Sequence, residues 1–420
     1  MPYSAITTRY PGEEFVSFIA RGRRHLGRAI PEERQPAVPP AFSLARRSSN
    51  RIQLEVIDDI VALENQWRAL EAQVDKPQLF QSYDWCAAWL RACKAVGLHE
   101  DVRIVTLWRN NRAVLIWPLA VRRLFSFRIL HSFAEPATQC ADVLVEPGED
   151  AVRLVEHALT AVRTWKDIHL VELRRVRDGS PLKSLQTLSA FVVTGTENAA
   201  PVLDFTRLQN ATVDAHRSSR SRNALHRHER KIGALGVLCY ELLTEPEREC
   251  EALLRAAALK RVWTREKGLM SSGNAHPASL GCLLEFAHRG KLTVAQLLVG
   301  DRVAAIEIGI VERGCYWSLV QSYDFDFAKY GPGRLLFHHL LELCPGLGIE
   351  RFDFLAPATR HKTEWSNVEI PVCDFLVPTS IAGSAARFYL AHAKPSLRQI
   401  ASRLSRPVRQ KARRLVGTLS

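Results

Sequence analysis

The chain has 420 residues, which is too long for one ordinary hydrophobic core and predicts about two or three domains. Apolar residues make up 47% and charged residues 24%, as in ordinary globular proteins. No apolar run reaches the roughly 18–20 residues that a membrane span needs, and the N-terminus lacks the apolar stretch of a secretory signal. We therefore expect a cytoplasmic protein.

The net charge of +13 is concentrated at the two ends of the sequence. Residues 1–50 contain eight arginines and four glutamates and are rich in proline, which predicts a disordered basic leader. Residues 381–420 contain nine basic residues and no acidic one, whereas residues 51–380 are balanced. A nucleic-acid enzyme more often has its positive charge on the folded core, so this distribution disfavours nucleic acid as a partner.

Nine cysteines are scattered along the chain, without a Cys-x-x-Cys pair and without the Cys/His spacing of a zinc site. Most of them lie within apolar patterns. We therefore expect buried free thiols and no metal.

The first part of the chain, residues 51–205, has the pattern of an α/β domain. Asp58 or Asp59 is the expected N-cap of the first helix, and Ser82 that of the second. The expected elements, in chain order, are a strand at 51–57, helices at 58–73 and 81–93, strands at 101–108, 112–121, 126–131 and 140–145, a helix at about 149–165 and a strand at 168–174.

A joint at DFTRL (204–208) is followed by a second expected domain, residues 206–365. Gly300-Asp301 and Arg313-Gly314 have the composition of tight turns, so the three strands around them are expected to form an antiparallel meander. The expected elements are a basic helix at 214–235, a strand at 237–242, helices at about 246–266 and 277–289, the meander at 291–324, a helix at 332–345 and a strand at 351–355. Residues 366–420 are expected to add a closing strand and a basic helical tail.

The stretch KYGPGR (329–334) joins the meander to the next helix. Pro332 fits the first helical turn, and the flanking glycines let a ligand approach the backbone closely. The free N–H groups and the positive end of the helix dipole suit an anion, although an ordinary helix start explains the same residues. The candidate cofactor-binding residues are Lys329, Tyr330, Gly331, Gly333 and Arg334.

A meander, a glycine-containing loop, a helix and one more strand is the element order of acyl-CoA N-acyltransferases, and this part of the chain resembles the GNAT superfamily. The pyrophosphate loop of that family reads Arg/Gln-x-x-Gly-x-Gly/Ala. Gly331 and Gly333 match its glycines, whereas Ala328 stands where the family has Arg or Gln. The resemblance implies an acyl-CoA co-substrate whose pyrophosphate lies on the backbone amides of residues 331–334.

Four longer stretches resemble the bacterial cellulose-biosynthesis (CelD/BcsL-like) acetyltransferases and their Fem-type relatives. They are FQSYDWCAAWL, SRSRNALHRHERKIGALG, SYDFDFAKYGPGRLL and FDFLAPATRHKTEW, which occur in that order within residues 51–380. Ala356 and His361 depart from the family pattern, while Asp353 and Lys362 match it. The resemblance implies an α/β fold of two tandem GNAT-like domains, with mixed, mostly antiparallel sheets flanked by helices and the donor loop in the second domain.

Acyl transfer requires that the acceptor lose a proton and that the leaving thiolate be stabilised. The acid at 353 stands between two phenylalanines in a strand pattern, so alternation places it on the face opposite to both, where it could orient the acceptor or act as a base. Glu307, in the apolar strand AAIEIGI, is expected on the exposed face. Each candidate also has a simpler interpretation as a surface charge, a strand-end acid or a core tyrosine. The candidate catalytic residues are Asp353, Lys362, Asp324 and Tyr323.

The basic helix HRSSRSRNALHRHERK (216–231) contains six arginines or lysines and one acid. Arg220, Arg227 and Lys231 fall near one face and are candidate substrate-binding residues for a polyphosphate, a polyanionic acceptor or RNA; a solvated face explains them equally well. The C-terminal tail is also basic, with apolar residues at helical spacing. Such a segment can lie on an anionic membrane surface, pack on the core or stay disordered.

The sequence thus predicts an acyltransferase that moves an acyl group from acetyl-CoA or another acyl-CoA to an amine or a hydroxyl. The family implies a small-molecule or saccharide acceptor in exopolysaccharide, cellulose or envelope biosynthesis. One alternative is a Fem-type aminoacyl transferase that uses aminoacyl-tRNA, which only the basic helix supports locally. Another is a catalytically degenerate GNAT fold that acts as a binding or scaffold protein, which Ala328 favours. The expected location is the cytoplasm, and contact of the C-terminal tail with the inner face of the cell membrane is one alternative.

Overall fold

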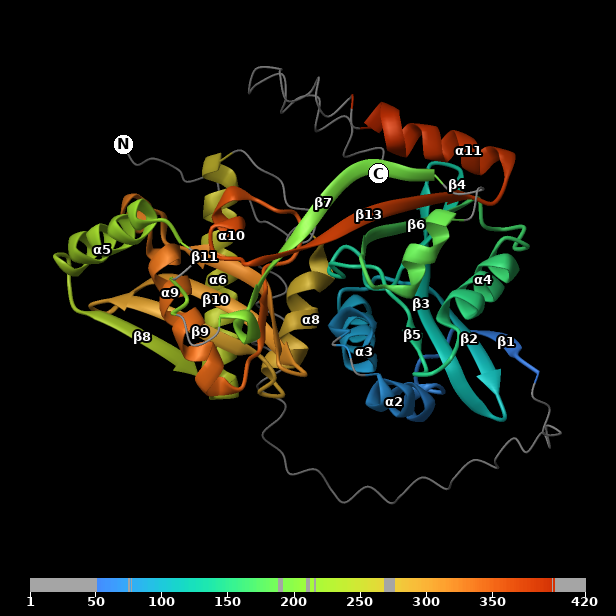
Figure 1. Cartoon of the computed structure of the whole chain (residues 1–420), viewed down its shortest axis with the longest axis horizontal. Helices are drawn as coiled ribbons and strands as arrows, with labels where there is room; N and C mark the ends of the chain where they lie inside the picture. The colour runs from blue at the N-terminus through green and yellow to red at the C-terminus, as the bar shows by residue number, and fades with distance from the viewer. Residues whose placement is uncertain are drawn as a thin grey trace, which may run out of the picture.

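The computed structural model describes residues 51–394, except for 75, 77, 188–191, 209–211, 215, 216 and 268–275, together with residue 396. Its strands form one mixed sheet of 13 strands, flanked by helices (Figure 1). The fold is therefore α/β, as the sequence predicts. The basic leader expected at 1–50 and most of the C-terminal tail lie outside the described residues.

In the N-terminal half of the sheet, the first four strands are apolar and pair antiparallel with their neighbours in the sequence. Ser82 caps the second helix by accepting the N–H of Trp85, as predicted. The first helix begins only at Glu64, because Asp59 accepts the N–H of Val61 in a turn and does not cap a helix. The elements are β1 (Gln53–Ile57), α2 (Glu64–Gln73), α3 (Tyr83–Ala95), β2 (Asp101–Arg109), β3 (Arg112–Leu124), β4 (Phe127–Ser132), β5 (Leu144–Val145), α4 (Ala151–Val162) and β6 (Leu170–Arg177).

The C-terminal half contains the predicted meander. Gly300 and Gly314 have φ of +56° and +69°, the left-handed conformation that its two tight turns require. The elements are α5 (Ser219–Gly233), β8 (Leu238–Leu243), α6 (Pro246–Lys267), α8 (Pro277–Ala287), β9 (Thr293–Val299), β10 (Arg302–Glu312), β11 (Cys315–Tyr323), α9 (Pro332–Leu343), β12 (Arg351–Asp353) and α10 (Arg360–Thr363). Strands β8 to β11 pair antiparallel in chain order.

Two long strands, β7 (Val192–Asp204) and β13 (Val368–Pro378), join the halves (Figure 1). After the second half is complete, the chain returns, and β13 pairs with β6 on one side and β7 on the other. No strand was predicted from the sequence at the position of β7. The full strand order is β1-β2-β3-β4-β6-β13-β7-β12-β11-β10-β9-β8, with β5 paired to β3.

The two halves also share an apolar core. Trp85 of α3 packs on Phe286 of α8 with ring centres 5.8 Å apart, and Phe80 packs on Trp317 of β11 at 5.4 Å. All the cysteines are free, and all except Cys239 are buried. In the part of the chain that the structure describes, no group of His, Cys, Asp and Glu side chains could hold a metal ion, and no helix is long and apolar enough to cross a membrane.

Candidate functional site

The loop before α9 presents a free backbone N–H group at the start of a helix. Gly331 has φ of +63°, which glycine adopts without strain, and Pro332 begins the helix. The carbonyl of Gly331 accepts the N–H of Arg334 at 3.0 Å. Within the described residues nothing accepts the N–H of Gly333, and nothing lies within 4 Å of the position where its Cβ would stand. This free donor and the helix dipole can receive an anion.

Positive charge from α5 and α9 surrounds this donor loop, residues 329–334. The imidazole of His228 lies 3.5 Å from the position of a Cβ on Gly331, and its Nδ1 is buried without a partner in the described chain. Burial lowers the pKa of His228, and the charges of Arg334, Arg227 and Lys231 lower it further. The start of α9 is therefore an electropositive place.

The basic residues near α5 divide into a structural one and exposed ones. Arg217 is buried and stacks on the ring of Trp365 at 3.7 Å, so it holds the helix against the core. The predicted substrate-binding residues are exposed, and none has an ion-pair partner among the residues described: Arg220, Arg227 and Lys231.

The other predicted loop residues have local partners. The ammonium of Lys329 lies 5.0 Å over the ring of Tyr330, and Lys329 is exposed. Arg334 forms an ion pair with Glu364, which follows α10. Among the described residues Lys329 therefore has no ion-pair partner at the rim of the loop, while Arg334 ties α9 to α10.

An open strand edge begins near the same place. Residues 315–317 of β11 pair in parallel with residues 351–353 of β12, and β12 then ends. Residues 318–323 have no strand partner on that side within the described residues. The pairing of β11 with β10 also shifts register between Ile308 and Gly309, which leaves Leu319 as a bulge. Backbone groups on such an edge can pair with amide groups of an extended ligand.

Glu307 of β10 is buried beside this edge, with 1% of its surface exposed. Ile306 and Ile308 pack into the core that contains α3 and α8, so alternation turns Glu307 to the sheet face that α9 covers. The hydroxyl of Ser318 donates to its Oε1 at 2.6 Å, and Oε2 has no partner in the described chain. Burial raises the pKa of Glu307 to about 8. The expectation of an exposed face was wrong, because helices cover both faces of this sheet.

Lys362 of α10 is half-buried on the other side of the open edge. Its Nζ donates to the carbonyl of Leu355 at 2.9 Å. Burial lowers the pKa of Lys362 to about 8, although the charges of Asp353 and Glu307 oppose this shift. Each of these two charges thus affects the pKa of the other near the end of β12, although no hydrogen bond or ion pair joins Glu307 and Lys362 among the described residues.

Asp353, at the end of β12, forms a buried ion pair with Arg177 of β6. Both carboxylate oxygens accept from the guanidinium, with 3.0 Å between Nη2 and Oδ1, and the N–H of Leu355 donates to Oδ1 at 2.8 Å. Arg177 also lies 5.0 Å over the ring of Trp317. Burial disfavours the charge of Arg177, but Asp353 raises its pKa overall.

A cleft of about 620 Å³ lies between the two halves, with this ion pair in its wall. The first residues of β11 line it, so it lies at the end of β11 that is opposite to the donor loop. Its lining is mixed, with amide, hydroxyl, carboxyl and aromatic groups. They include Gln78, Gln81, Asp142, Ser180, Trp317 and Asp353.

The two remaining predicted catalytic residues lie at the donor-loop end of β11. Asp324 accepts the N–H of Asp326 at 3.0 Å and pairs with Arg302 at 2.7 Å, which fixes the short helix Phe325–Tyr330. The hydroxyl of Tyr323 accepts a hydrogen bond from Nε1 of Trp263 at 2.9 Å. The structure therefore brings Lys362 near Asp353, and places Asp324 and Tyr323 at the other end of the strand.

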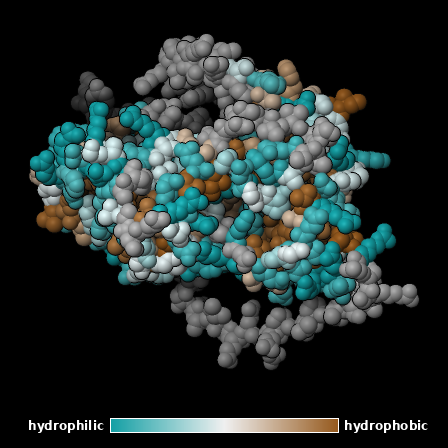
Figure 2. Space-filling view, in the orientation of Figure 1, coloured by the Kyte–Doolittle hydropathy of each residue, from teal (hydrophilic) through white to brown (hydrophobic). Residues whose placement is uncertain are grey.

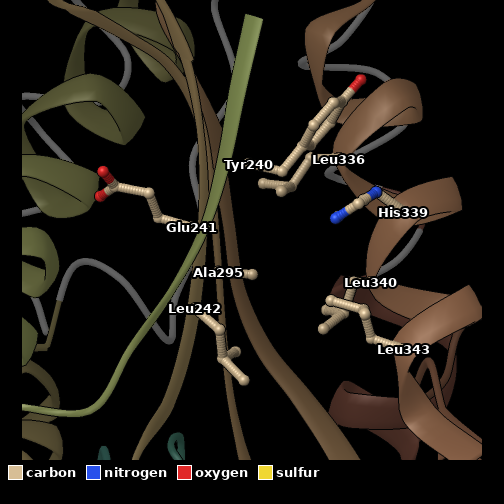
Figure 3. A pocket seen from close by; sticks show the side chains of 8 residues that line it. All are labelled: Tyr240, Glu241, Leu242, Ala295, Leu336, His339, Leu340 and Leu343. Carbon is tan, nitrogen blue, oxygen red and sulfur yellow. The ribbon is translucent and has the colours of Figure 1, made fainter. Parts of the chain in front are cut away.

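A second hollow, between β8 and α9, is too small for a ligand. Its volume is about 10 Å³, which is close to the least that one water molecule needs. Tyr240 stacks on His339 with ring centres 4.2 Å apart, and Figure 3 shows these rings beside the leucines that fill the gap. This hollow is a packing feature of the α9 face.

Two residues of the site, Glu307 and Arg177, were not predicted from the sequence as site residues. Glu307 was noticed as a lone acid in an apolar strand, and that apolar context was the available signal of burial. Arg177 gave no signal, because its partner Asp353 is 176 positions away.

The comparisons with known proteins find one sequence family over part of the chain and several solved structures with a similar fold. Residues 219–363, from α5 through α10, match a family described as "Acetyltransferase (GNAT) domain". This segment contains all the residues predicted here for cofactor, substrate and catalysis. No curated protein matches the chain in sequence.

Several solved structures share the fold over most of the chain. A conserved protein of unknown function from Bacteroides thetaiotaomicron is 14% identical with a TM-score of 0.52, and covers 77% of this chain and 100% of its own. FemX is 9% identical with a TM-score of 0.53, over 78% and 97%. L-PGS from Bacillus licheniformis is 12% identical with a TM-score of 0.50, over 77% and 95%. These likenesses show the fold alone.

Proposed function

We propose that this protein transfers an acyl group from an acyl-CoA to an amine or a hydroxyl of a polar acceptor. One observation carries the proposal: the loop at residues 329–334 lies at one end of β11, the cleft lies at the other end, and the open edge at residues 318–323 lies between them, with Glu307 of β10 beside it. The acetyltransferase match over residues 219–363 supports the same reaction class. A saccharide or envelope-precursor acceptor, as in cellulose biosynthesis, is the finer part of the proposal and rests on the resemblance of the four sequence stretches.

The donor's pyrophosphate would lie on the free N–H of Gly333. Arg227 and Lys231 stand close enough to lower the pKa of His228 and would add attraction at long range. The pantetheine arm of CoA carries two amides, which can pair with the open edge of β11 at residues 318–323. This path brings the thioester toward Glu307 and Lys362. The loop's departure at Ala328 matters little in this arrangement, because backbone groups and α5 supply the contacts.

Glu307 and Lys362 would move the protons of the reaction. The acceptor nitrogen attacks the thioester carbonyl, Glu307 accepts the proton that this nitrogen loses, a C–N bond forms and the C–S bond breaks. The ammonium of Lys362 donates a proton to the leaving thiolate. Its pKa of about 8 is close to that of a thiol, about 8.5. Transfer of the proton from Glu307 to Lys362 restores both groups.

The cleft between the halves would receive the acceptor. It ends at Asp353 and Trp317, where β11 and β12 separate. Asp353 is already bound to Arg177 and Leu355, so its role in this proposal is to orient groups at the inner end of the cleft, while Glu307 takes the proton.

Thermal unfolding with and without ligands tests the donor site. Acetyl-CoA, or another member of an acyl-CoA panel, should raise the Tm, and Gly333→Trp should abolish the shift by filling the place above the free N–H. Gly346→Trp is the matched control, because nothing lies within 4 Å of a Cβ at Gly346 either and it lies outside the loop. If no acyl-CoA raises the Tm, or if both tryptophan variants behave alike, the donor site is refuted.

The exposed cations of α5 favour one second candidate, an aminoacyl transferase that uses aminoacyl-tRNA. A tRNA should then raise the Tm where acyl-CoA does not, and Arg227→Gln with Lys231→Gln should weaken its binding, with Arg265→Gln on α6 as an exposed basic control. If neither ligand binds, the remaining reading is a GNAT-fold scaffold without catalysis.

A further inference from the structure

One corner of the molecule exposes three large apolar side chains. Phe125, in the turn between β3 and β4, is 63% exposed, and Ile381 and Phe388 of α11 (Ile381–Phe388) are 94% and 64% exposed. The rings of Phe125 and Tyr389 meet with centres 5.4 Å apart, so the turn and the helix form one surface. Figure 2 shows hydrophobic atoms projecting at the position of α11 in Figure 1. We call Phe125, Ile381 and Phe388 the apolar corner.

The small residues of helix α11 pack against the sheet, whereas its large apolar residues project into solvent. Gly383 and Ala386 are buried against β13 and β6, and a Cβ on Gly383 would stand 1.7 Å from the carbonyl oxygen of His169. Ile381 and Phe388 are seven residues apart, which is about two turns, so they project on the same side. The usual arrangement in a surface helix is the reverse, because large apolar side chains gain most from burial.

The charge around the apolar corner is positive. Arg123 is exposed and Arg387 half-buried, and neither has an ion-pair partner among the described residues. The sequence that continues from α11 has no acid: residues 397–420 hold seven arginines or lysines and lie outside the described residues.

From these observations we propose that the apolar corner docks on a lipid surface that contains anionic headgroups. Phe125, Ile381 and Phe388 enter the boundary between headgroups and acyl chains, and Arg123 and Arg387 contact the headgroups. A single exposed apolar residue needs no explanation, but three on one surface beside unpaired cations form the two-part signal that stable membrane contact requires.

The position of the corner is compatible with activity on the membrane. Helix α11 and helix α5 lie toward opposite ends of the molecule, so a lipid surface under α11 leaves α5 accessible (Figure 1). The inference does not depend on the proposed acyl transfer, because neither the donor loop nor the cleft contributes a residue to it. Either proposal can fail alone.

Co-sedimentation of the full chain with vesicles tests the inference. The protein should bind vesicles of equal parts phosphatidylcholine and phosphatidylserine more tightly than pure phosphatidylcholine vesicles, and added salt should weaken the binding. The triple variant Phe125→Asn, Ile381→Ser, Phe388→Ser should bind the anionic vesicles at least about tenfold more weakly, because it removes three insertable side chains. Asparagine is chosen at 125 because Phe125 has φ of +54°.

The control variant removes three apolar side chains that are more than half exposed elsewhere: Val61→Ser, Leu235→Ser and Val237→Ser. It should bind as the wild type does. The inference is overturned if the wild type shows no preference for anionic vesicles, or if the triple variant binds them unchanged, which would leave tail charge as the whole cause. It is also overturned if the wild type is a dimer by light scattering that the triple variant abolishes without any effect on vesicle binding.

Discussion

Arg177 and Asp353, which are 176 positions apart in the sequence, form a two-point ion pair that joins the halves of the molecule. Arg177 ends β6 and Asp353 ends β12, and both are largely buried, with side-chain exposures of 13% and 3%. The pair stands where β11 and β12 separate, at the inner end of the cleft. It therefore ties the geometry of the cleft to the relative position of the halves.

Breaking this ion pair on one side should destabilise the fold strongly. Asp353→Asn leaves the charge of Arg177 buried without its anion, and the expected loss is about 3–5 kcal/mol in the free energy of unfolding. Urea denaturation followed by fluorescence measures it. The double variant Arg177→Met, Asp353→Leu removes both charges and should recover most of the loss, so the two substitutions should be strongly non-additive.

The exposed pair between Lys183 and Asp178 is the control for this cycle. Its side chains are 25% and 49% exposed, so Asp178→Asn should cost less than about 1 kcal/mol. Additive effects of the Arg177 and Asp353 substitutions would show that the pair does not act as a unit.

Glu307 should make the stability of the protein fall as the pH rises. Its pKa is raised by burial from an ordinary 4.5 to about 8 in the folded state. Below pH 4.5 the carboxyl is neutral in both states; between 4.5 and 8 the unfolded chain releases the proton that the folded chain retains, so stability decreases. Glu307→Gln should remove this slope and gain roughly 3–5 kcal/mol relative to the wild type from pH 4.5 to pH 8. Chemical denaturation across this pH range measures the difference.

Ser318→Ala gives an internal check on the same carboxyl. The Ser318 hydrogen bond lowers the pKa of Glu307 against the larger effect of burial, so its removal should raise that pKa further and extend the pH-dependent loss to higher pH. Parallel stability profiles for the wild type and Glu307→Gln would contradict the burial of an ionisable group at this position.

The rate of acyl transfer should pass through a maximum near pH 8. The proposed reaction needs Glu307 ionised, which high pH favours, and Lys362 protonated, which low pH favours, and both pKa values are about 8. Lys362→Arg keeps the positive charge but does not titrate in this range, so its profile should lose the fall at high pH. A rate that does not change from about two pH units below to about one pH unit above these pKa values would exclude Glu307 and Lys362 from proton transfer.

The meander and the start of α9 were predictable because their signals are local. Gly300 and Gly314 mark the turns, and the alternating apolar strands between them fix the register of three neighbouring strands. Pro332 marks the first residue of α9, which begins where the sequence indicates. Such patterns need no knowledge of distant residues.

The joining of the halves was not predictable, because it depends on pairing between distant segments. Val202 of β7 opposes Val368 of β13, and nothing in either segment specifies the other. The same limit concealed the Arg177–Asp353 pair. Glu307 shows a different limit: a strand pattern states which residues share a face, but not whether a helix covers that face.

The two glycines of the donor loop should respond differently to alanine. Gly331→Ala forces a φ of +63° on a residue with a Cβ, at a cost of about 1–2 kcal/mol; its contact with His228 at 3.5 Å is ordinary and adds little. Gly333→Ala lies in the first turn of α9 with open space around it and should be neutral or slightly stabilising. Thermal unfolding of both variants distinguishes the cases. Equal losses of thermal stability in the two variants would mean that residue 331 is not held in the left-handed conformation.

Gly383→Ala should detach α11 from the sheet. The new Cβ would stand 1.7 Å from the carbonyl oxygen of His169 and 2.7 Å from its carbon, and both are backbone atoms that cannot rotate away. The helix must therefore move outward from β13, at an expected cost of about 3 kcal/mol or more. Hydrogen exchange should show faster exchange in residues 381–388 and unchanged exchange in α9. Gly346→Ala, which meets nothing within 4 Å, is the control. An unchanged exchange rate in α11 would mean that the close approach of Gly383 to His169 does not hold this helix in place.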